Sequence, residues 1–236
     1  KNSFRKVELR REDISFLQYT GGTTGVPKSA MLSHDNLLAN LMQVDGWIRN
    51  RVKAGEEVVL TALPLYHIFA LTANCMLSIK IGARNVLIPD PRDLPKLVKT
   101  IEKVNMTVLT GVNTLFNALL NNEEFRKLDF SHLNIVLGGG TAIQNAVAQR
   151  WKEVTKKPLI QAYGLTETSP AVTINPFDGR HIDGSIGLPI PSTEVAIRDN
   201  DGNDLAPKEI GEICVRGPQV MVGYWQKPQE TANVFF

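Results

Sequence analysis

Val58-Val59-Leu60-Thr61-Ala62-Leu63 is a short, mostly apolar run of β-prone residues, and it begins the pattern that decides the fold. Four further runs of the same kind follow, separated by stretches with helical periodicity. They are Asn85–Ile88, Thr107–Leu109, Asn134–Leu137 and Leu159–Tyr163. Strands that alternate with helices in this way form a parallel sheet with helices on its faces. The sequence therefore predicts an α/β fold for this region.

The connecting helices carry start signals and apolar faces of their own. Asp93 can cap a helix that has Pro95 in its first turn. On one face of that helix the apolar residues are Leu97, Val98, Ile101 and Val104. The stretch Gln144–Thr155 is amphipathic in the same way. Both segments are expected to cover the sheet.

The two ends of the chain differ from this middle region. Ile14–Tyr19 is typical of a strand that runs into the Gly/Thr-rich segment Thr20–Gly25, and Asn36–Leu41 is predicted to be helical. After Gly179, two strand-like segments flank the turn Asp199–Asn203 and predict a small antiparallel unit. These segments are Glu194–Arg198 and Gly211–Arg216. We therefore expect an α/β subdomain over residues 1–178 and the start of a β-barrel-like subdomain over residues 179–236.

Composition excludes several classes of protein. The 236 residues carry 26 Lys+Arg against 24 Asp+Glu, a balance that argues against a nucleic-acid partner. Cys75 and Cys214 suggest neither a disulfide framework nor a zinc site, which fits a cytoplasmic protein. No apolar run is long enough to span a bilayer, so any membrane contact would be peripheral, at the inner face. Because the chain starts without Met and stops after the apolar Val234-Phe235-Phe236, we expect an internal piece of a longer protein.

The segment Tyr19-Thr20-Gly21-Gly22-Thr23-Thr24-Gly25-Val26-Pro27-Lys28 has the parts of a phosphate-binding loop. Its glycines let backbone N–H groups approach phosphate oxygens, its threonines add hydroxyl donors, and Lys28 adds a cation. The spacing is not that of a P-loop NTPase, since Pro27 blocks the helix expected there. A flexible turn with a surface lysine is the plain alternative.

Two further motifs follow this loop along the chain: Leu137-Gly138-Gly139-Gly140 and Tyr163-Gly164-Leu165-Thr166-Glu167-Thr168. The order of the three motifs resembles that in the adenylate-forming superfamily of acyl-CoA synthetases, luciferases and peptide-synthetase adenylation domains. The resemblance covers essentially the whole chain and is closest to bacterial long-chain fatty-acid–CoA ligases. It implies that the chain is an internal fragment of the large N-terminal domain, that residues 1–178 bind ATP and the acyl group, and that a C-terminal lid domain is absent.

The resemblance also assigns roles to residues. It implies that the nucleotide lies against the residues of the three motifs: Tyr19, Thr20, Gly21, Gly22, Thr23, Thr24, Gly25, Lys28, Gly138, Gly139, Gly140, Gln161, Ala162, Tyr163, Gly164 and Thr166. Tyr163 would stack on adenine, Thr166 would contact a phosphate or carboxylate, and Glu167, with Thr23, would hold Mg²⁺. A helix N-terminal acid is the alternative role for Glu167.

His67, in Pro64-Leu65-Tyr66-His67-Ile68-Phe69, matches the substrate-side motif of that family. It is expected either to orient the reacting carboxylate or to shape the pocket, and a satisfied core histidine is the alternative. Amino-acid-activating relatives place an Asp here, so a plain carboxylic acid is favoured. The catalytic set is then Lys28, His67, Thr166 and Glu167. Asp183-Gly184-Ser185-Ile186-Gly187-Leu188-Pro189 is interpreted as a structural junction.

The reaction that the resemblance implies is activation of a fatty acid by ATP to acyl-AMP, followed by transfer to coenzyme A. Alternatives are a medium-chain or aryl acyl-CoA ligase, an acyl-AMP ligase that serves a carrier protein, and a non-catalytic nucleotide-binding module. Loops of the family usually read Pro-Lys-Gly, whereas this chain has Pro27-Lys28-Ser29. Long-chain members can carry a gating Trp where this chain has Phe69-Ala70-Leu71. A homodimer is compatible with the sequence, which leaves the acyl chain length open.

Overall fold

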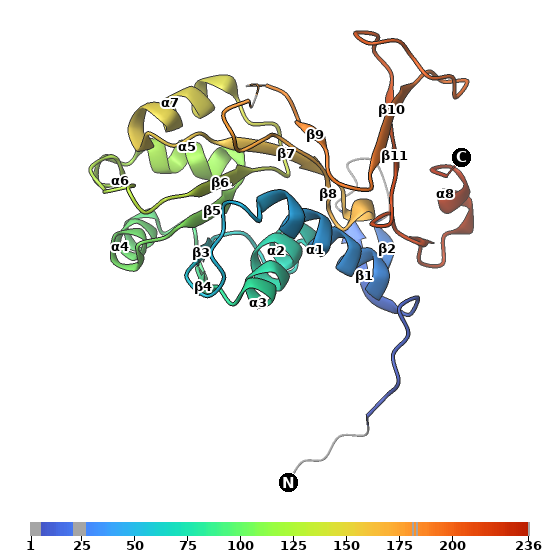
Figure 1. The fold of residues 1–236 in the computed structure, drawn as a ribbon, viewed down its shortest axis with the longest axis horizontal. Helices are drawn as coiled ribbons and strands as arrows, with labels where there is room; N and C mark the ends of the chain where they lie inside the picture. Colours follow the sequence, from blue (N-terminus) through green and yellow to red (C-terminus); the bar gives the residue numbers. More distant parts are fainter. Residues whose placement is uncertain (1–5, 21–26, 181, 183, 236) are drawn as a thin grey trace.

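The central element is a seven-stranded sheet with the order β4-β3-β5-β6-β7-β8-β9. The computed structural model describes residues 6–20, 27–180, 182 and 184–235. The first five strands of the sheet are parallel to one another, and β8 and β9 run antiparallel at one edge (Figure 1). The strands are β3 (Val58–Thr61), β4 (Arg84–Leu87), β5 (Val108–Gly111), β6 (Ile135–Gly138), β7 (Ile160–Gly164), β8 (Ala171–Ile174) and β9 (Leu188–Pro189). The predicted parallel α/β sheet is confirmed, and each of the five apolar runs contributes one of its parallel strands.

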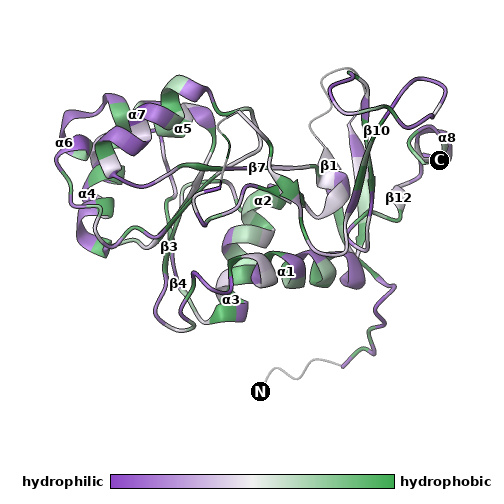
Figure 2. Ribbon diagram, turned by 45° about the horizontal axis from the view of Figure 1, so that its top comes forward, coloured by the Kyte–Doolittle hydropathy of each residue, from purple (hydrophilic) through white to green (hydrophobic). Residues whose placement is uncertain are grey.

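Helices cover both faces of the sheet because successive strand residues point to opposite sides. Leu60, Leu109 and Val136 pack against one layer of helices, while Val59, Val108 and Ile135 pack against the other. The first layer contains α4 (Leu94–Val104), α5 (Asn113–Asn121), α6 (Glu123–Arg126) and α7 (Asn145–Thr155), and the second contains α1 (His34–Ile48), α2 (Ile68–Ala70), the π-helix η1 (Leu71–Met76) and α3 (Leu77–Ile81). Figure 2 shows the apolar sides of α1, α2 and α3.

The predicted helix signals act as expected. The Asp93 side chain accepts a hydrogen bond from the Lys96 backbone N–H at 3.1 Å, and proline lies in the first turn of α4. Leu97, Val98 and Ile101 are buried in the core on one face of α4. In α7, Trp151 is fully buried and lies edge-on to Phe116 of α5, with ring centroids 5.0 Å apart. Apolar periodicity therefore identified the faces that cover the sheet.

A smaller antiparallel sheet has the order β1-β2-β12 and comprises β1 (Ile14–Thr20), β2 (Lys28–Ser33) and β12 (Gly223–Tyr224). Thr20 pairs with Lys28, so the Gly/Thr-rich segment connects two paired strands, as its flanking residues predict. Ser33 caps α1 through a hydrogen bond from the Asn36 N–H at 3.1 Å, and the Asn36 side chain accepts from the Ser33 N–H at 3.0 Å. This capping box fixes the exit of β2.

The C-terminal part contains the predicted antiparallel pair, β10 (Glu194–Arg198) with β11 (Glu212–Arg216). The Asp199 side chain accepts backbone N–H groups of Asp201 and Asn203 in the turn that follows β10. The structure adds the 3₁₀-helix η2 (Thr166–Thr168), which precedes this part, and α8 (Pro228–Ala232), which lies within it. After residue 179, β9 and β12 also pair with strands from earlier in the chain. The boundary at residues 178 and 179 stays a prediction.

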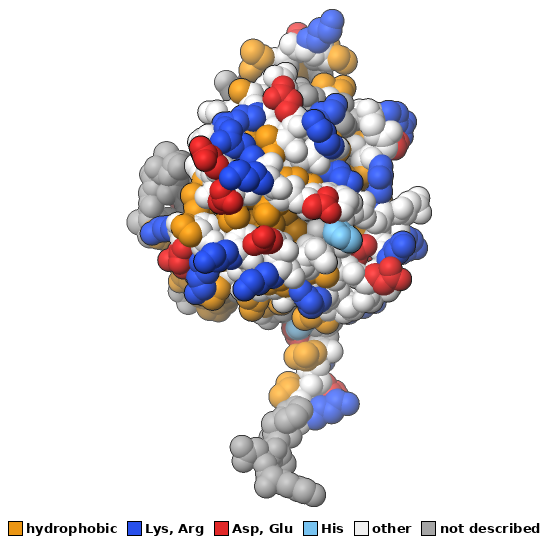
Figure 3. Space-filling model, turned by 90° about the vertical axis from the view of Figure 1, so that its left-hand side faces the viewer, with side chains coloured by type: hydrophobic (Ala, Val, Ile, Leu, Met, Phe, Trp, Pro, Cys, Tyr) orange, Lys and Arg blue, Asp and Glu red, His pale blue; other side chains and the backbone are white. Residues whose placement is uncertain are grey.

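Charges are mixed on the surface. On the face that includes α4 and α6, basic and acidic side chains are interspersed (Figure 3). In the described ranges of the chain, no helix combines the length and the apolar character needed to cross a membrane.

Candidate active site

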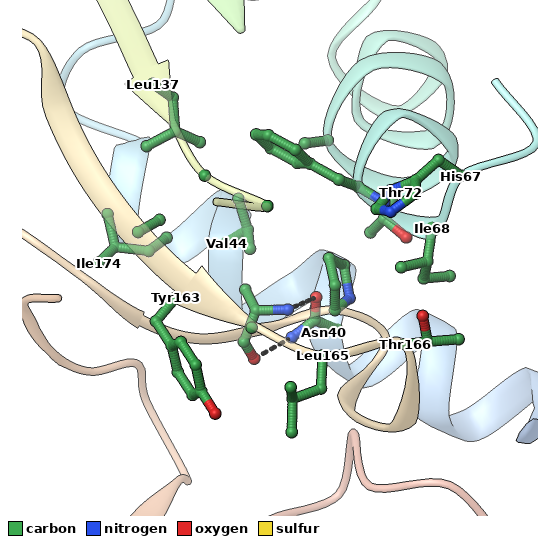
Figure 4. Close-up of a pocket in the computed structure, with 18 of the residues that line it drawn as sticks. Asn40, Val44, His67, Ile68, Thr72, Leu137, Tyr163, Leu165, Thr166 and Ile174 are labelled. Carbon is green, nitrogen blue, oxygen red and sulfur yellow. Dashed lines mark hydrogen bonds between the residues drawn. The ribbon is translucent and has the colours of Figure 1, made fainter. Parts of the chain in front are cut away.

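A cavity of about 500 Å³ lies where β6 and β7 end. Its walls come from the end of β1, from α1, from residues 67–73 and from the chain between β7 and β8. In open parallel sheets, ligands bind at this carboxyl edge. Figure 4 shows His67 and Thr166 on one side of the cavity and Leu137 and Ile174 on the other.

The cavity gathers residues that the sequence places far apart. The predicted site residues among its lining are Thr20, His67, Gly139, Gly140, Ala162, Tyr163, Gly164, Thr166 and Glu167. Tyr19, Lys28, Gly138 and Gln161 are not part of this lining, as far as the described residues define it. Gly138 and Gln161 are partners across β6 and β7, and Tyr19 is 67% exposed on β1. The ligand contacts of all these residues stay predictions.

Part of the predicted phosphate loop is outside the described residues. Gly21, Gly22, Thr23, Thr24 and Gly25 fall there, together with Asp183 of the predicted junction. Thr20 at the entry to the loop and Lys28 at its exit are described and face each other in the β1–β2 ladder.

A close backbone approach at the cavity requires glycine at one position and makes a side chain tight at another. A Cβ on Gly164 would lie 2.1 Å from the carbonyl oxygen of Pro170, and one on Gly139 would lie 3.3 Å from that of Ala162. The first distance is impossible for any side chain. Gly164 therefore lets the chain after β7 fold back tightly, which brings Thr166 and Glu167 to the cavity.

Tyr163 lies beside Glu167 at the edge of the cavity. Partial burial, and then the nearby Glu167 carboxylate, raise the pKa of the Tyr163 phenol. The phenol therefore stays neutral at physiological pH, and its ring remains available for stacking.

His67 caps the short helix α2. Its Nδ1 accepts a hydrogen bond from the Phe69 backbone N–H at 3.2 Å, so a neutral ring carries its hydrogen on Nε2 and can donate from that atom. The side chain lines the cavity and is exposed rather than part of the core. A buried core role is thus disfavoured.

The π-helix η1 directly follows α2 and is tied to the sheet. Asn74 is fully buried, donates to Thr61 Oγ1 at 2.9 Å and accepts from Thr110 Oγ1 at 2.9 Å. The Asn74 carbonyl accepts from Asn85 Nδ2 at 3.0 Å. A satisfied buried network of this kind fixes an element rigidly. Through it, η1 holds Thr72 and Ala73 against the cavity.

Glu167 and Lys28 meet at one tyrosine that the sequence analysis did not identify. The Tyr224 hydroxyl donates to Glu167 Oε1 at 2.6 Å, and Lys28 Nζ lies 5.1 Å from the centroid of the Tyr224 ring. Lys28 also forms an ion pair with Glu230 of α8. The two charged groups predicted to act on the triphosphate are thus neighbours of one side chain.

A second, apolar cavity borders the first on the side of the core. The two share Val44, Ala73, Leu137 and Ile174 as walls. Beyond them the second cavity is enclosed between α1, α3 and the sheet, with Ile48, Leu77, Ile81, Val108 and Ile135 among its residues. This cavity has a volume of only about 30 Å³, so an alkyl chain could enter it only if the walls moved apart, and its lining offers no charge to pair an ammonium.

Sequence reasoning also missed Asn40 and Thr72. Asn40 is fully buried and exchanges two hydrogen bonds with the Ala171 backbone, at 2.9 and 3.1 Å (Figure 4). Thr72 Oγ1 donates to the Ser169 carbonyl at 3.1 Å. A polar residue on the apolar face of a predicted helix was the available signal for Asn40. For Tyr224, the only signal in the sequence was an aromatic residue after Gly223.

The chain is an α/β domain with helices on both faces of its sheet and this cavity at the carboxyl edge. Comparisons with known proteins identify the family that has this architecture. Residues 2–225 match the AMP-binding enzyme family, and the chain belongs to that family. It is 57% identical over 229 residues to the long-chain-fatty-acid–CoA ligase of Salmonella typhimurium. The matched region covers 97% of this chain and 41% of that relative. The corresponding ligase of Bacillus subtilis is 44% identical, covering 94% of this chain and 40% of the relative.

Solved structures agree with this membership. The crystal structure of ATP-bound MatB from Rhodopseudomonas palustris superposes with a TM-score of 0.89 at 30% identity, covering 99% of this chain and 45% of that one. The chain therefore has the fold of an adenylate-forming enzyme's N-terminal region, as its motifs predict. It spans about two fifths of the length of the curated relatives named above.

Proposed function

We propose that this chain is the nucleotide- and acyl-binding part of an enzyme that activates a fatty acid with ATP and passes it to coenzyme A. The observation that carries the proposal is a single cavity that joins Tyr163, Thr166 and Glu167 to His67 and shares walls with a small apolar enclosure. The similarity to long-chain-fatty-acid–CoA ligases supports the same substrate class.

The proposed reaction has two steps. A carboxylate oxygen of the fatty acid attacks the α-phosphorus of ATP, the bond to the β-phosphate oxygen breaks, and acyl-AMP and pyrophosphate result. The sulfur of coenzyme A then attacks the acyl carbon, its proton passes to solvent, and AMP leaves. Positioning and charge neutralisation are the main contributions that protein groups make to such transfers.

Individual residues suit these tasks. Nε2 of His67 can donate to the fatty-acid carboxylate, which fixes the attacking oxygen without a formal charge. The Thr166 hydroxyl faces the same cavity and can donate to a phosphate oxygen. Lys28 supplies a cation on the phosphate side, where its ammonium must exchange Glu230 for the triphosphate.

The residues fit a magnesium ion that is carried mainly by phosphate oxygens. Among the described residues there is no cluster of three His, Cys, Asp or Glu side chains, whereas Glu167 offers one carboxylate at the cavity. Mg²⁺ commonly binds through one or two carboxylates together with substrate phosphates and water. Bound there, it would neutralise charge on the phosphates, with Glu167 and, from outside the described residues, Thr23 as its protein ligands.

Carboxylate-dependent exchange of pyrophosphate into ATP by the full-length protein tests the proposal. Palmitate or decanoate should support exchange and leucine or phenylalanine should not, because the apolar enclosure offers no partner for an ammonium. Lys28→Ala and Glu167→Ala should each lower the rate about tenfold to hundredfold, the value of a hydrogen bond to a charged group. Exchange driven best by amino acids would contradict the proposed substrate, and no exchange with any acid would favour the non-catalytic module.

The remaining expectations also belong to this proposal. A cytoplasmic location, peripheral contact with the inner face of the membrane and a homodimer are carried over from the sequence. A series of acids of graded length in the same assay would distinguish a long-chain enzyme from a medium-chain or aryl ligase. Replacing coenzyme A with a carrier protein would identify an acyl-AMP ligase.

A further inference from the structure

Tyr224 contacts both charged residues that are assigned to the triphosphate. Its hydroxyl donates to Glu167 Oε1 at 2.6 Å, while its ring lies 5.1 Å from Lys28 Nζ. The residue is only 7% exposed, so neither contact is a chance encounter on the surface. Glu167 lies in η2 and Lys28 lies in β2, 139 positions earlier in the sequence. Tyr224 contacts both of these residues.

The backbone around Tyr224 is fixed from several directions. Tyr224 pairs with Ala30 of β2, and its N–H donates to Thr231 Oγ1 at 2.9 Å. The Met221 N–H donates to the Glu167 carbonyl at 2.8 Å. Asn36 of α1 donates to the carbonyls of Pro218 and Val220 at 2.9 and 2.8 Å. The backbone at Tyr224 therefore cannot shift relative to β2 and η2 without breaking hydrogen bonds.

The chemistry of the phenol suits a fixed donor. A phenol is an O–H donor at neutral pH, so the Tyr224 hydroxyl can supply the hydrogen of its 2.6 Å bond to Glu167 Oε1. A neutral donor on Oε1 orients the carboxylate without cancelling its charge. Among the described residues, no group forms a hydrogen bond with Oε2 of Glu167, the oxygen that a cation would contact. The face of an aromatic ring attracts an ammonium weakly and lets it turn toward a stronger anion.

We infer that Tyr224 is a positioning residue that holds the Glu167 carboxylate and the Lys28 ammonium at one spacing, so that both can engage a single magnesium-bound triphosphate. The inference rests on the proposed function only in taking Mg–ATP as the ligand. The hydroxyl serves the carboxylate and the ring serves the ammonium, so two substitutions separate the two contacts.

Calorimetric titration of the full-length protein with ATP, in EDTA and at increasing Mg²⁺, tests this division. Tyr224→Phe keeps the ring, so ATP affinity in EDTA should be unchanged, while the gain in affinity from Mg²⁺ should fall about tenfold, the value of one hydrogen bond to a charged group. Tyr224→Leu removes the ring as well and should also weaken binding in EDTA. Tyr66→Phe is the matched control, since Tyr66 is 82% exposed and loses the same hydroxyl.

A double-mutant cycle with Glu167→Gln shows whether Tyr224 acts through Glu167. The hydroxyl should matter little once the carboxylate is gone, so the effects of Tyr224→Phe and Glu167→Gln should be far from additive. Additive effects, or a Tyr224→Phe protein that binds Mg–ATP like the wild type, would overturn the inference. Equal losses with and without Mg²⁺ at an unchanged melting temperature would do the same.

Failure of the proposed function looks different. Absence of any carboxylate-dependent exchange would contradict the fatty-acid ligase, yet the Mg²⁺-dependent part of ATP binding would still report on Tyr224. If Tyr224→Phe itself fails to fold, the Mg²⁺ dependence of Glu167→Gln decides: a wild-type dependence in that variant would refute the role of the carboxylate that Tyr224 is inferred to hold.

Discussion

Lys28 is paired in this structure with a carboxylate that nucleotide binding would displace. Its ammonium contacts Glu230 of α8, and the two side chains are 35% and 42% exposed. The hydrogen bond from Lys28, and then the positive charge itself, lower the pKa of Glu230, so this carboxyl group is ionised throughout the neutral range. A triphosphate that approaches Lys28 therefore competes with an internal anion.

Replacing Glu230 with Gln should strengthen ATP binding. Exposed ion pairs are weak, so the dissociation constant should fall by no more than about fivefold, and the gain should shrink as salt is added. Titration calorimetry at low and high salt measures both effects, with the exposed Glu153→Gln on α7 as the matched loss of one negative charge. Weaker ATP binding in Glu230→Gln would mean that Glu230 helps to place Lys28 for the nucleotide instead of competing with it.

A site residue can be predicted from the sequence when the pattern that marks it lies within a few neighbouring residues. His67, Thr166 and Glu167 were predicted because each stands in a short motif, and the structure places all three at one cavity. Tyr224 and Glu230 were missed because their contacts with Glu167 and Lys28 join residues at least 57 positions apart, which leave no local pattern. Site residues that act through tertiary contacts are therefore hard to predict from one sequence.

At the scale of elements, the same contrast separates long segments from short ones. The five parallel strands and α4 carry several apolar residues in register, which periodicity detects. Two-residue strands such as β9 and β12 have no period to detect, and they form because neighbouring strands offer free edges. The π-helix η1 depends likewise on partners outside itself, since the Asn74 carbonyl is satisfied by Asn85 of β4.

Two glycines in regular elements should respond oppositely to alanine. At Gly164 an added Cβ would lie 2.1 Å from the Pro170 carbonyl oxygen, whereas at Gly46 of α1 nothing lies within 4 Å. Gly46→Ala should stabilise the protein by about 0.5–1 kcal/mol through helix propensity. Gly164→Ala should destabilise it by about 1–3 kcal/mol, as other overpacked sites do, and disturb the cavity.

Urea unfolding monitored by circular dichroism measures both changes. Gly46 is not part of the cavity lining, so the Gly46→Ala protein should bind ATP like the wild type. A Gly164→Ala protein with unchanged stability would show that the turn after β7 can relax and that its tight approach to Pro170 is not required.

At the scale of the whole molecule, the amides of α1 join the sheets. Asn36 binds the segment before β12, Asn40 binds β8, and Gln43 donates to the Pro191 carbonyl at 2.7 Å. Gln219 is fully buried and donates to Thr193 Oγ1 at 2.7 Å. Buried polar groups that are all paired resist separation of the parts they connect. The walls of the cavity are therefore contributed by parts of the chain that are tied to one another.

Ligand binding should for this reason raise the stability of the entire fold. A nucleotide in the cavity would touch the end of β1, the carboxyl edge of the central sheet and η2, so unfolding of any of these parts would require its release. At ATP concentrations about 100 times the dissociation constant, linkage predicts about 2.7 kcal/mol of added stability. For a chain of this length that corresponds to a rise in melting temperature of about 5–11 °C. Differential scanning calorimetry with Mg–ATP measures the shift, and Lys28→Ala at the same ATP concentration should show a smaller one because its dissociation constant is higher. A rise of equal size in Lys28→Ala would place the stabilising nucleotide somewhere other than this cavity and its phosphate-side lysine.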